Sequence, residues 1–95
     1  MKINIKATGI ELTPAITEYV EKRVNTLEKY IERNIEGLIA EVEVGRSTKH
    51  HKTGDVFMAE VHISGGGIDI FALAEEADLY AAVDVVRDEL AHSLV

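Results

Sequence analysis

The sequence predicts an α+β fold: a two-layer sandwich in which two helices cover one face of a four-stranded sheet and water covers the other. Four short segments alternate apolar and polar residues with a period of two, as half-buried strands do, and two longer segments repeat apolar residues at helical spacing. Their order along the chain is β-α-β-β-β-α. With 95 residues and no linker, repeat or low-complexity stretch, residues 1–95 are expected to form a single domain.

The first strand is expected at residues 2–7, where polar and apolar residues alternate and both isoleucines turn inward. Thr13 and Pro14 then signal a helix start, because the Thr13 hydroxyl can accept a hydrogen bond from an unpaired backbone N–H and proline fits the first helical position. The helix is expected to run to about Asn34. At about 100° per residue, its core stripe contains five apolar side chains: Ile16, Val20, Val24, Leu27 and Ile31.

Alternation predicts three further strands, over residues 38–44, 57–63 and 68–74. A polar segment, residues 46–55, connects the first two as a long hairpin, and three consecutive glycines connect the last two. Asp78 can cap a final helix. The apolar residues of that helix recur at helical spacing: Leu79, Ala82, Val83, Val86, Leu90 and Leu94.

Composition narrows the classes of protein that fit. Without cysteine there is no disulfide, thiol nucleophile or thiolate metal site, and no apolar run approaches the roughly 20 residues of a membrane span. The alternating N-terminus does not resemble a signal peptide, so we expect a cytoplasmic protein. The nucleophile elbow G-x-S-x-G, the P-loop and the zinc motif H-E-x-x-H are all absent, and we expect neither an enzyme nor a cofactor or small-molecule substrate.

Net charge is −7, from 17 acidic and 10 basic residues, whereas contact with nucleic-acid phosphates needs clustered Lys and Arg. The first helix has such a cluster. Lys22, Lys29 and Arg33 point in one direction, and Arg23 lies at the boundary of the core stripe. The alternative is an ordinary solvated helix face with pairs such as Glu18 and Lys22.

A second group of candidate cations lies in the hairpin connection: Arg46, Lys49, His50, His51 and Lys52. It could reach into an RNA groove, or it could be an ordinary polar hairpin. Adjacent histidines on an extended backbone point to opposite sides and no third ligand is evident, so no metal site is expected here.

The open face of the sheet should carry Met58, Phe71 and Leu73 if the alternation holds. Such exposed apolar groups are common, yet a partner could cover them. They support a competing hypothesis, in which the chain is an acidic protein–protein interaction module or a homodimer that associates through this face.

Several segments together resemble the ribosome-hibernation-factor family, which includes ribosome hibernation promoting factors, ribosome-associated inhibitors and sigma-54 modulation proteins. They are residues 10–16 (IELTPAI), 27–30 (LEKY), 48–63 (TKHHKTGDVFMAEVHI) and 78–84 (DLYAAVD). The resemblance covers essentially the whole chain, and it implies the same β-α-β-β-β-α arrangement, which is similar to the double-stranded-RNA-binding fold.

The resemblance also implies a function. Such proteins bind the small ribosomal subunit and occupy its decoding region, which blocks mRNA and tRNA binding and inhibits translation during stress or stationary phase, without catalysis. The implied partner surface is ribosomal RNA, held through phosphate geometry. The candidate rRNA-binding residues are Lys22, Arg23, Lys29, Arg33, Arg46, Lys49, His50, His51, Lys52, Arg87 and His92. A weaker alternative is a binder of double-stranded RNA away from the ribosome.

The last helix departs from the family pattern, because it contains Arg87 and His92 among many carboxylates. Glu89 and His92 occupy positions that are usually basic in the family, and the sequence stops at Val95, where a basic tail usually begins. We therefore expect fewer phosphate contacts from this helix. We also expect an N-terminal domain excised from a longer protein, whose second domain would pair ribosomes into dimers.

Overall fold

A computed structural model describes residues 1–31, 35–47 and 54–95. The elements follow the predicted order: β1 (Lys2–Thr8), α1 (Pro14–Asn25), the 3-10 helices η1 (Thr26–Tyr30) and η2 (Ile35–Gly37), β2 (Ile39–Arg46), β3 (Phe57–Gly65), β4 (Ile68–Glu76) and α2 (Leu79–Leu94). The α+β prediction is confirmed.

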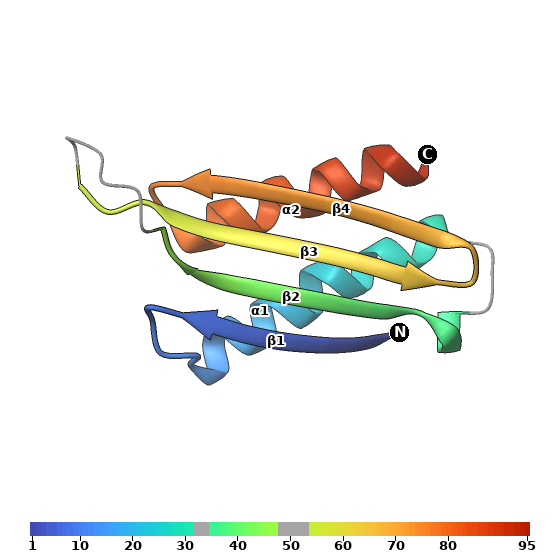
Figure 1. Cartoon of the computed structure of the whole chain (residues 1–95), viewed down its shortest axis with the longest axis horizontal. Coiled ribbons are helices and arrows are strands. Elements are labelled where there is room, and N and C mark those ends of the chain that lie inside the picture. The colour runs from blue at the N-terminus through green and yellow to red at the C-terminus, as the bar shows by residue number, and fades with distance from the viewer. Residues whose placement is uncertain (32–34, 48–53) are drawn as a thin grey trace.

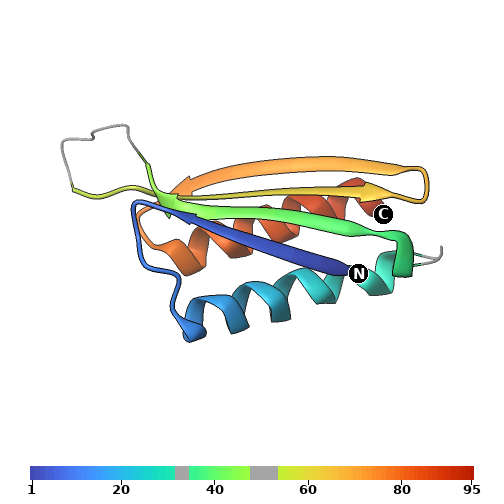
Figure 2. The ribbon, with the colours of Figure 1, turned by 60° about the horizontal axis from the view of Figure 1, so that its bottom comes forward.

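The four strands form one mixed sheet in the order β1-β2-β3-β4. β1 pairs with β2 in parallel, from Lys2 opposite Ile39 to Thr8 opposite Gly45, while the other two pairings are antiparallel. Both α-helices lie on the same face of this sheet and run in the same direction (Figures 1 and 2). The opposite face is left open, and the charged and apolar side chains of alternate strand positions project from it.

The core lies between the sheet and the helices and is built from aliphatic side chains. Leu27, Leu38, Ile63 and Leu90 are fully buried there. Four of the five residues expected in the core stripe of the first helix are buried, and Ile16 is partly buried at its edge. The predicted stripe of the last helix is likewise buried, apart from its partly exposed final residue, Leu94.

The first helix starts as predicted and ends earlier than expected. The Thr13 hydroxyl accepts a hydrogen bond from the Ile16 backbone N–H at 3.2 Å. The α-helix stops at Asn25, and residues 26–30 form the tighter 3-10 turn η1, as helix ends often do. The expected end near Asn34 lies outside the described residues. The Thr26 hydroxyl donates to the Arg23 carbonyl oxygen at 2.5 Å, which adds a second donor to a carbonyl that also accepts from the Thr26 backbone N–H.

The glycine turn between the last two strands and the cap of the last helix have clear physical causes. Gly66 and Gly67 join β3 to β4 with φ of 58° and 83°, a left-handed pair typical of a tight type I′ hairpin and strained for other residues. The Asp78 carboxylate accepts from the Ala81 backbone N–H at 3.2 Å and starts α2.

Within the described part of the chain, neither helix has the length and continuous apolar character needed to cross a bilayer.

Candidate nucleic-acid interface

Of the cations predicted on the first helix, Arg23 faces the last helix, and two carboxylates of α2 meet it there. Arg23 donates from Nε to Asp84 Oδ1 at 2.9 Å, and its Nη2 lies 3.9 Å from Asp88 Oδ1. The Arg23 side chain is 30% exposed. Arg23 therefore ties the two helices together and stays partly accessible to solvent.

Tyr19 completes this contact from the preceding turn of α1. Its hydroxyl donates to the same Asp84 Oδ1 at 2.6 Å, and its ring packs edge-on against Tyr80 with 4.8 Å between centroids. The hydrogen bond to the Asp84 carboxylate, followed by burial and the charge of Asp84, raises the pKa of Tyr19. Asp84 thus has two donors from α1, which fix its position.

Asp88 lies between two candidate cations. Besides its proximity to Arg23, it accepts from Arg87 Nη1 at 3.0 Å, and Arg87 Nε donates to the Thr26 hydroxyl at 2.9 Å. The Arg87 side chain is only 13% exposed, whereas that of Asp88 is 60% exposed. The hydrogen bond to Asp88 is the main cause of the raised pKa of Arg87, which keeps this guanidinium charged.

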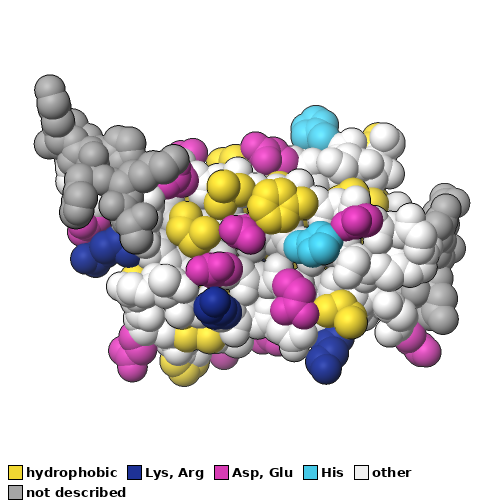
Figure 3. Space-filling view, in the orientation of Figure 1, with side chains coloured by type: hydrophobic (Ala, Val, Ile, Leu, Met, Phe, Trp, Pro, Cys, Tyr) yellow, Lys and Arg dark blue, Asp and Glu magenta, His cyan; other side chains and the backbone are white. Residues whose placement is uncertain are grey.

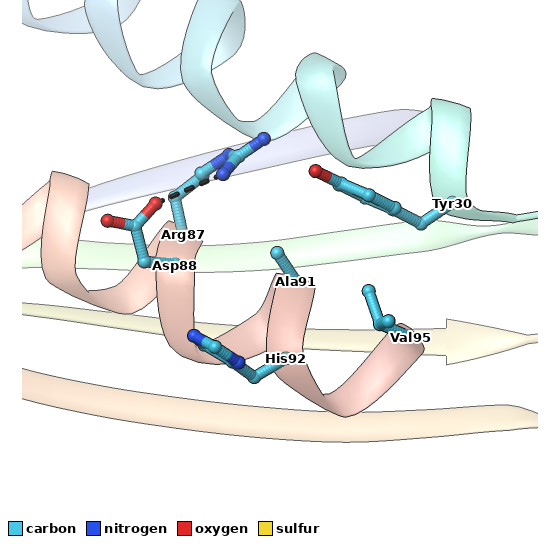
Figure 4. Close-up of a pocket in the computed structure, with 6 residues that line it drawn as sticks. All are labelled: Tyr30, Arg87, Asp88, Ala91, His92 and Val95. Atoms are coloured by element: carbon cyan, nitrogen blue, oxygen red, sulfur yellow. Dashed lines mark hydrogen bonds and ion pairs between the residues drawn. The ribbon is translucent and has the colours of Figure 1, made fainter.

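Tyr30, Arg87 and Lys29 form a cationic aromatic group where η1 meets the end of α2. The Arg87 guanidinium lies 5.8 Å from the Tyr30 ring centroid and the Lys29 ammonium 5.2 Å, both within cation–π range. Hydrogen bonding from Arg87, followed by the charges of both cations, lowers the pKa of Tyr30. A hollow of about 240 Å³ lies beside Tyr30 and Arg87. Its lining residues are drawn in Figure 4: Tyr30, Arg87, Asp88, Ala91, His92 and Val95.

Two lysines of this surface lack an acidic partner within the described part of the chain. Lys22 and Lys29 are exposed, and no carboxylate of the described residues lies within ion-pair distance of either ammonium group. We call Lys22, Arg23, Lys29 and Arg87 the helical cation row. These N–H groups can hold phosphate oxygens. Within residues 1–31, 35–47 and 54–95, no group of three or more His, Asp or Glu side chains could hold a metal ion.

The structure does not bring all candidate cations together. His92 is exposed beside Arg87 at the hollow of Figure 4. Arg46 instead ends β2 on the open-sheet side, 3.7 Å from Asp55 and 5.7 Å from the Phe57 ring centroid. It is therefore separate from the helical cation row. Arg33 and four hairpin residues lie outside the described residues: Lys49, His50, His51 and Lys52.

Sequence reasoning missed Asp84, Asp88 and Tyr30, which contact these cations, and Tyr19, which donates to Asp84. The four-residue spacing of Asp84 and Asp88 places both on one side of α2. That spacing was the only available signal, because two carboxylates on one side of a helix can meet cations of a neighbouring element as well as solvent. Which cations would meet it depended on the relative position of the two helices.

Fold and surface thus define a class: a small α+β domain with a row of cations on its helical layer, in a chain that is acidic as a whole. The family model described as Sigma 54 modulation protein / S30EA ribosomal protein matches residues 3–95. The chain belongs to this family, which confirms the resemblance read from the sequence.

Individual relatives agree with this assignment. The ribosome hibernation promoting factor of Salmonella typhimurium is 37% identical over 94 residues, covering 99% of this chain and 90% of that protein. The ribosome hibernation promoting factor of Azotobacter vinelandii is 32% identical over 95 residues, covering all of this chain and 80% of that protein. The crystal structure of the Thermus thermophilus Protein Y N-terminal domain is similar, with a TM-score of 0.82, 30% identity, and coverage of 99% and 96% of the two chains.

Proposed function

We propose that this protein is a non-catalytic ribosome hibernation factor of the bacterial cytoplasm. Residues 1–95 would act as one domain that binds the small ribosomal subunit, fills its decoding region, and keeps mRNA and tRNA out during stress or stationary phase. The observation that carries the proposal is the helical cation row, found in a chain whose relatives are named ribosome hibernation promoting factors.

The geometry supports phosphate binding from two kinds of cation. Lys22 and Lys29 project into solvent without a carboxylate partner among the described residues, so a phosphate can approach them at no cost in broken ion pairs. Arg23 and Arg87 are fixed by their partners on the facing helix. Fixed guanidinium groups lose little conformational entropy on binding. Because their positions are set, they favour recognition of a particular geometry of the RNA backbone and do not read the base sequence.

The test is cosedimentation with purified small ribosomal subunits over a range of salt concentrations, comparing the natural chain with a Lys22→Glu, Lys29→Glu variant. Removing two phosphate contacts should make the fall of log affinity with log salt less steep by about 2, and it should weaken binding at every salt concentration. The matched control is Lys2→Glu, Lys6→Glu, an equal charge change on exposed positions of β1 on the open sheet face.

Occupation of the decoding region has its own readout in the same assay. Small subunits that already hold mRNA and initiator tRNA should not bind the natural chain, because all three require the same channel. Undiminished binding in their presence would place the protein elsewhere on the subunit. An equal loss in the Lys2, Lys6 control would show that only overall charge matters, and the helical cation row would not be the contact surface.

A further inference from the structure

The open face of the sheet carries an apolar patch that the helices do not cover. It consists of Met58 on β3 with Phe71 and Leu73 on β4. Phe71 is 56% and Leu73 is 49% exposed. Figure 3 shows these hydrophobic side chains gathered over β3 and β4, with acidic side chains around them. Contiguous exposed apolar side chains rimmed by charge are typical of interaction surfaces.

Carboxylates surround this patch on three strands: Glu41, Glu43, Glu60, Asp69 and Glu75. Two of them face each other directly, because Glu43 of β2 is the register partner of Glu60 of β3. Like charges at opposed positions of neighbouring strands are destabilising. Glu43 accepts only a neutral donor, the Thr8 hydroxyl at 2.7 Å, and the Glu60 carboxylate has no hydrogen-bond or ion-pair partner among the described residues.

The opposed carboxylates separate two hollows in the sheet face. The first, about 280 Å³, has Met58 and Leu73 in its lining, and the second, about 240 Å³, has Phe71. Glu43 and Glu60 line both hollows. Each hollow therefore combines an apolar wall with the same pair of carboxylates, an arrangement suited to side chains with an apolar stem and a cationic head.

The remaining charges on this face neutralise the pair only in part. His62 lies 2.5 Å from Asp69 and is the partner of that carboxylate, while Arg46, at the end of the first hollow, lies 3.7 Å from Asp55. Lys6 of β1 is the register partner of Glu43 and lines the second hollow, but it forms no ion pair with any described carboxylate, and Glu60 has no cation opposite it. The face as a whole stays acidic, which repels phosphates and opposes a second copy of itself.

We propose that the open sheet face binds a basic polypeptide segment, with Arg or Lys side chains held by Glu43 and Glu60 and apolar side chains seated on the Met58, Phe71 and Leu73 patch. This goes beyond the proposed ribosomal role, which uses the opposite face. Charge complementarity selects the occupant. A cationic segment relieves the repulsion between Glu43 and Glu60 and covers the patch at the same time.

The test measures binding of a fluorescein-labelled octapeptide of alternating Arg and Leu by anisotropy, at low and moderate salt. Glu43→Gln, Glu60→Gln should weaken binding about tenfold, and Phe71→Ser, Leu73→Ser should weaken it by a similar factor. Glu18→Gln, Glu21→Gln is the matched control, since it removes the same charge from exposed positions of α1 and should leave the affinity within about twofold.

Amide chemical-shift changes on peptide addition give the location, and they are expected in β3 and β4. Equal weakening in the Glu18, Glu21 control, or shifts confined to the helices, would overturn the proposal in favour of general attraction to an acidic protein. Absence of peptide binding at low salt would also overturn it. A concentration-dependent dimer that Phe71→Ser, Leu73→Ser abolishes, with no peptide binding, would assign the face to a second copy instead.

Discussion

Arg23 of α1 and Asp84 of α2 are 61 residues apart in the chain and joined by a hydrogen bond of 2.9 Å within an ion pair. The pair connects the two helices on the surface that also carries the candidate phosphate-binding cations. The same guanidinium can therefore contribute to folding and to anion binding. Substitutions of its partners separate these two roles.

Asp84→Asn should lower the free energy of unfolding by about 1 kcal/mol, because Tyr19 and Arg23 both lose a charged acceptor while the shape of the side chain is kept. Urea denaturation measures this change. Glu89→Gln is the matched control, since it removes one carboxylate from an exposed position of α2 at which no side-chain partner is found among the described residues. Equal stability of Asp84→Asn and the natural chain would contradict a structural role for the pair.

Asp88→Asn should strengthen binding to small ribosomal subunits. The Asp88 carboxylate lies 3.9 Å from Arg23 and 3.0 Å from Arg87, so it competes with phosphate for both cations. Removing its charge should raise the affinity roughly three- to tenfold at low salt, with a smaller gain at high salt because of screening. The measurement is the cosedimentation assay, with Glu89→Gln beside it. A gain of the same size in Glu89→Gln would mean that net charge, and not release of Arg23 and Arg87, is responsible.

Gly45→Ala should separate β1 from β2. A methyl group at Gly45 would overlap the Thr8 carbonyl oxygen of the neighbouring strand, and backbone atoms cannot move aside as a flexible side chain can. Hydrogen exchange should show faster exchange of the β1 amides and a loss of unfolding free energy of roughly 2 kcal/mol. Gly37→Ala is the control, because a methyl group there meets nothing within 4 Å. Unchanged protection of the β1 amides would show that the sheet accommodates the methyl group without separating β1 from β2.

The tyrosines should titrate on opposite sides of the ordinary tyrosine pKa of 10.0. The raised pKa of Tyr19 means that folding favours its protonated form, so its contribution to stability is present below pH 10 and is lost as the pH rises through the raised value. Tyr30 has a lowered pKa, so folding favours its phenolate and its contribution appears only as the pH rises. Tyrosinate absorbance of Tyr19→Phe should lack the later component, and that of Tyr30→Phe the earlier one. The reverse assignment would contradict the described contacts.

The architecture could be predicted from sequence because each element has a local signal. Alternation gave the strands, and Thr13, Gly66 and Asp78 marked ends that depend only on nearby backbone. The end of the first helix was missed because its tightening at Thr26 arises from a hydroxyl that bonds back to the Arg23 carbonyl and also accepts from Arg87. Helical periodicity continues through a 3-10 turn closely enough to hide the change.

The sequence predicted the exposed cations of the candidate site but not the partners that hold the others. A helical wheel placed Lys22 and Lys29 on one sector, and both are exposed on the helical layer. The same wheel placed Arg23 at the edge of the core stripe without revealing Asp84 as its partner, since that contact depends on how two helices pack. Arg46 was grouped with the RNA-binding candidates by its neighbours in sequence, whereas its position at the end of β2 puts it beside the open sheet face.

The parallel pairing of β1 with β2 also bears on how the chain acquires its fold during synthesis. In the described sheet β1 is an edge strand that pairs with β2 alone, and this pairing begins with Lys2 opposite Ile39. Residues 2–8 are therefore made well before the strand that will pair with them, a delay of roughly 2 to 7 s at ordinary rates of translation. During that time the backbone N–H and C=O groups of β1 are unpaired and its isoleucines have no core to join. β1 thus stays unpaired until β2 has been made, whereas the hairpins formed by β2, β3 and β4 need no such delay because their partners follow directly along the chain.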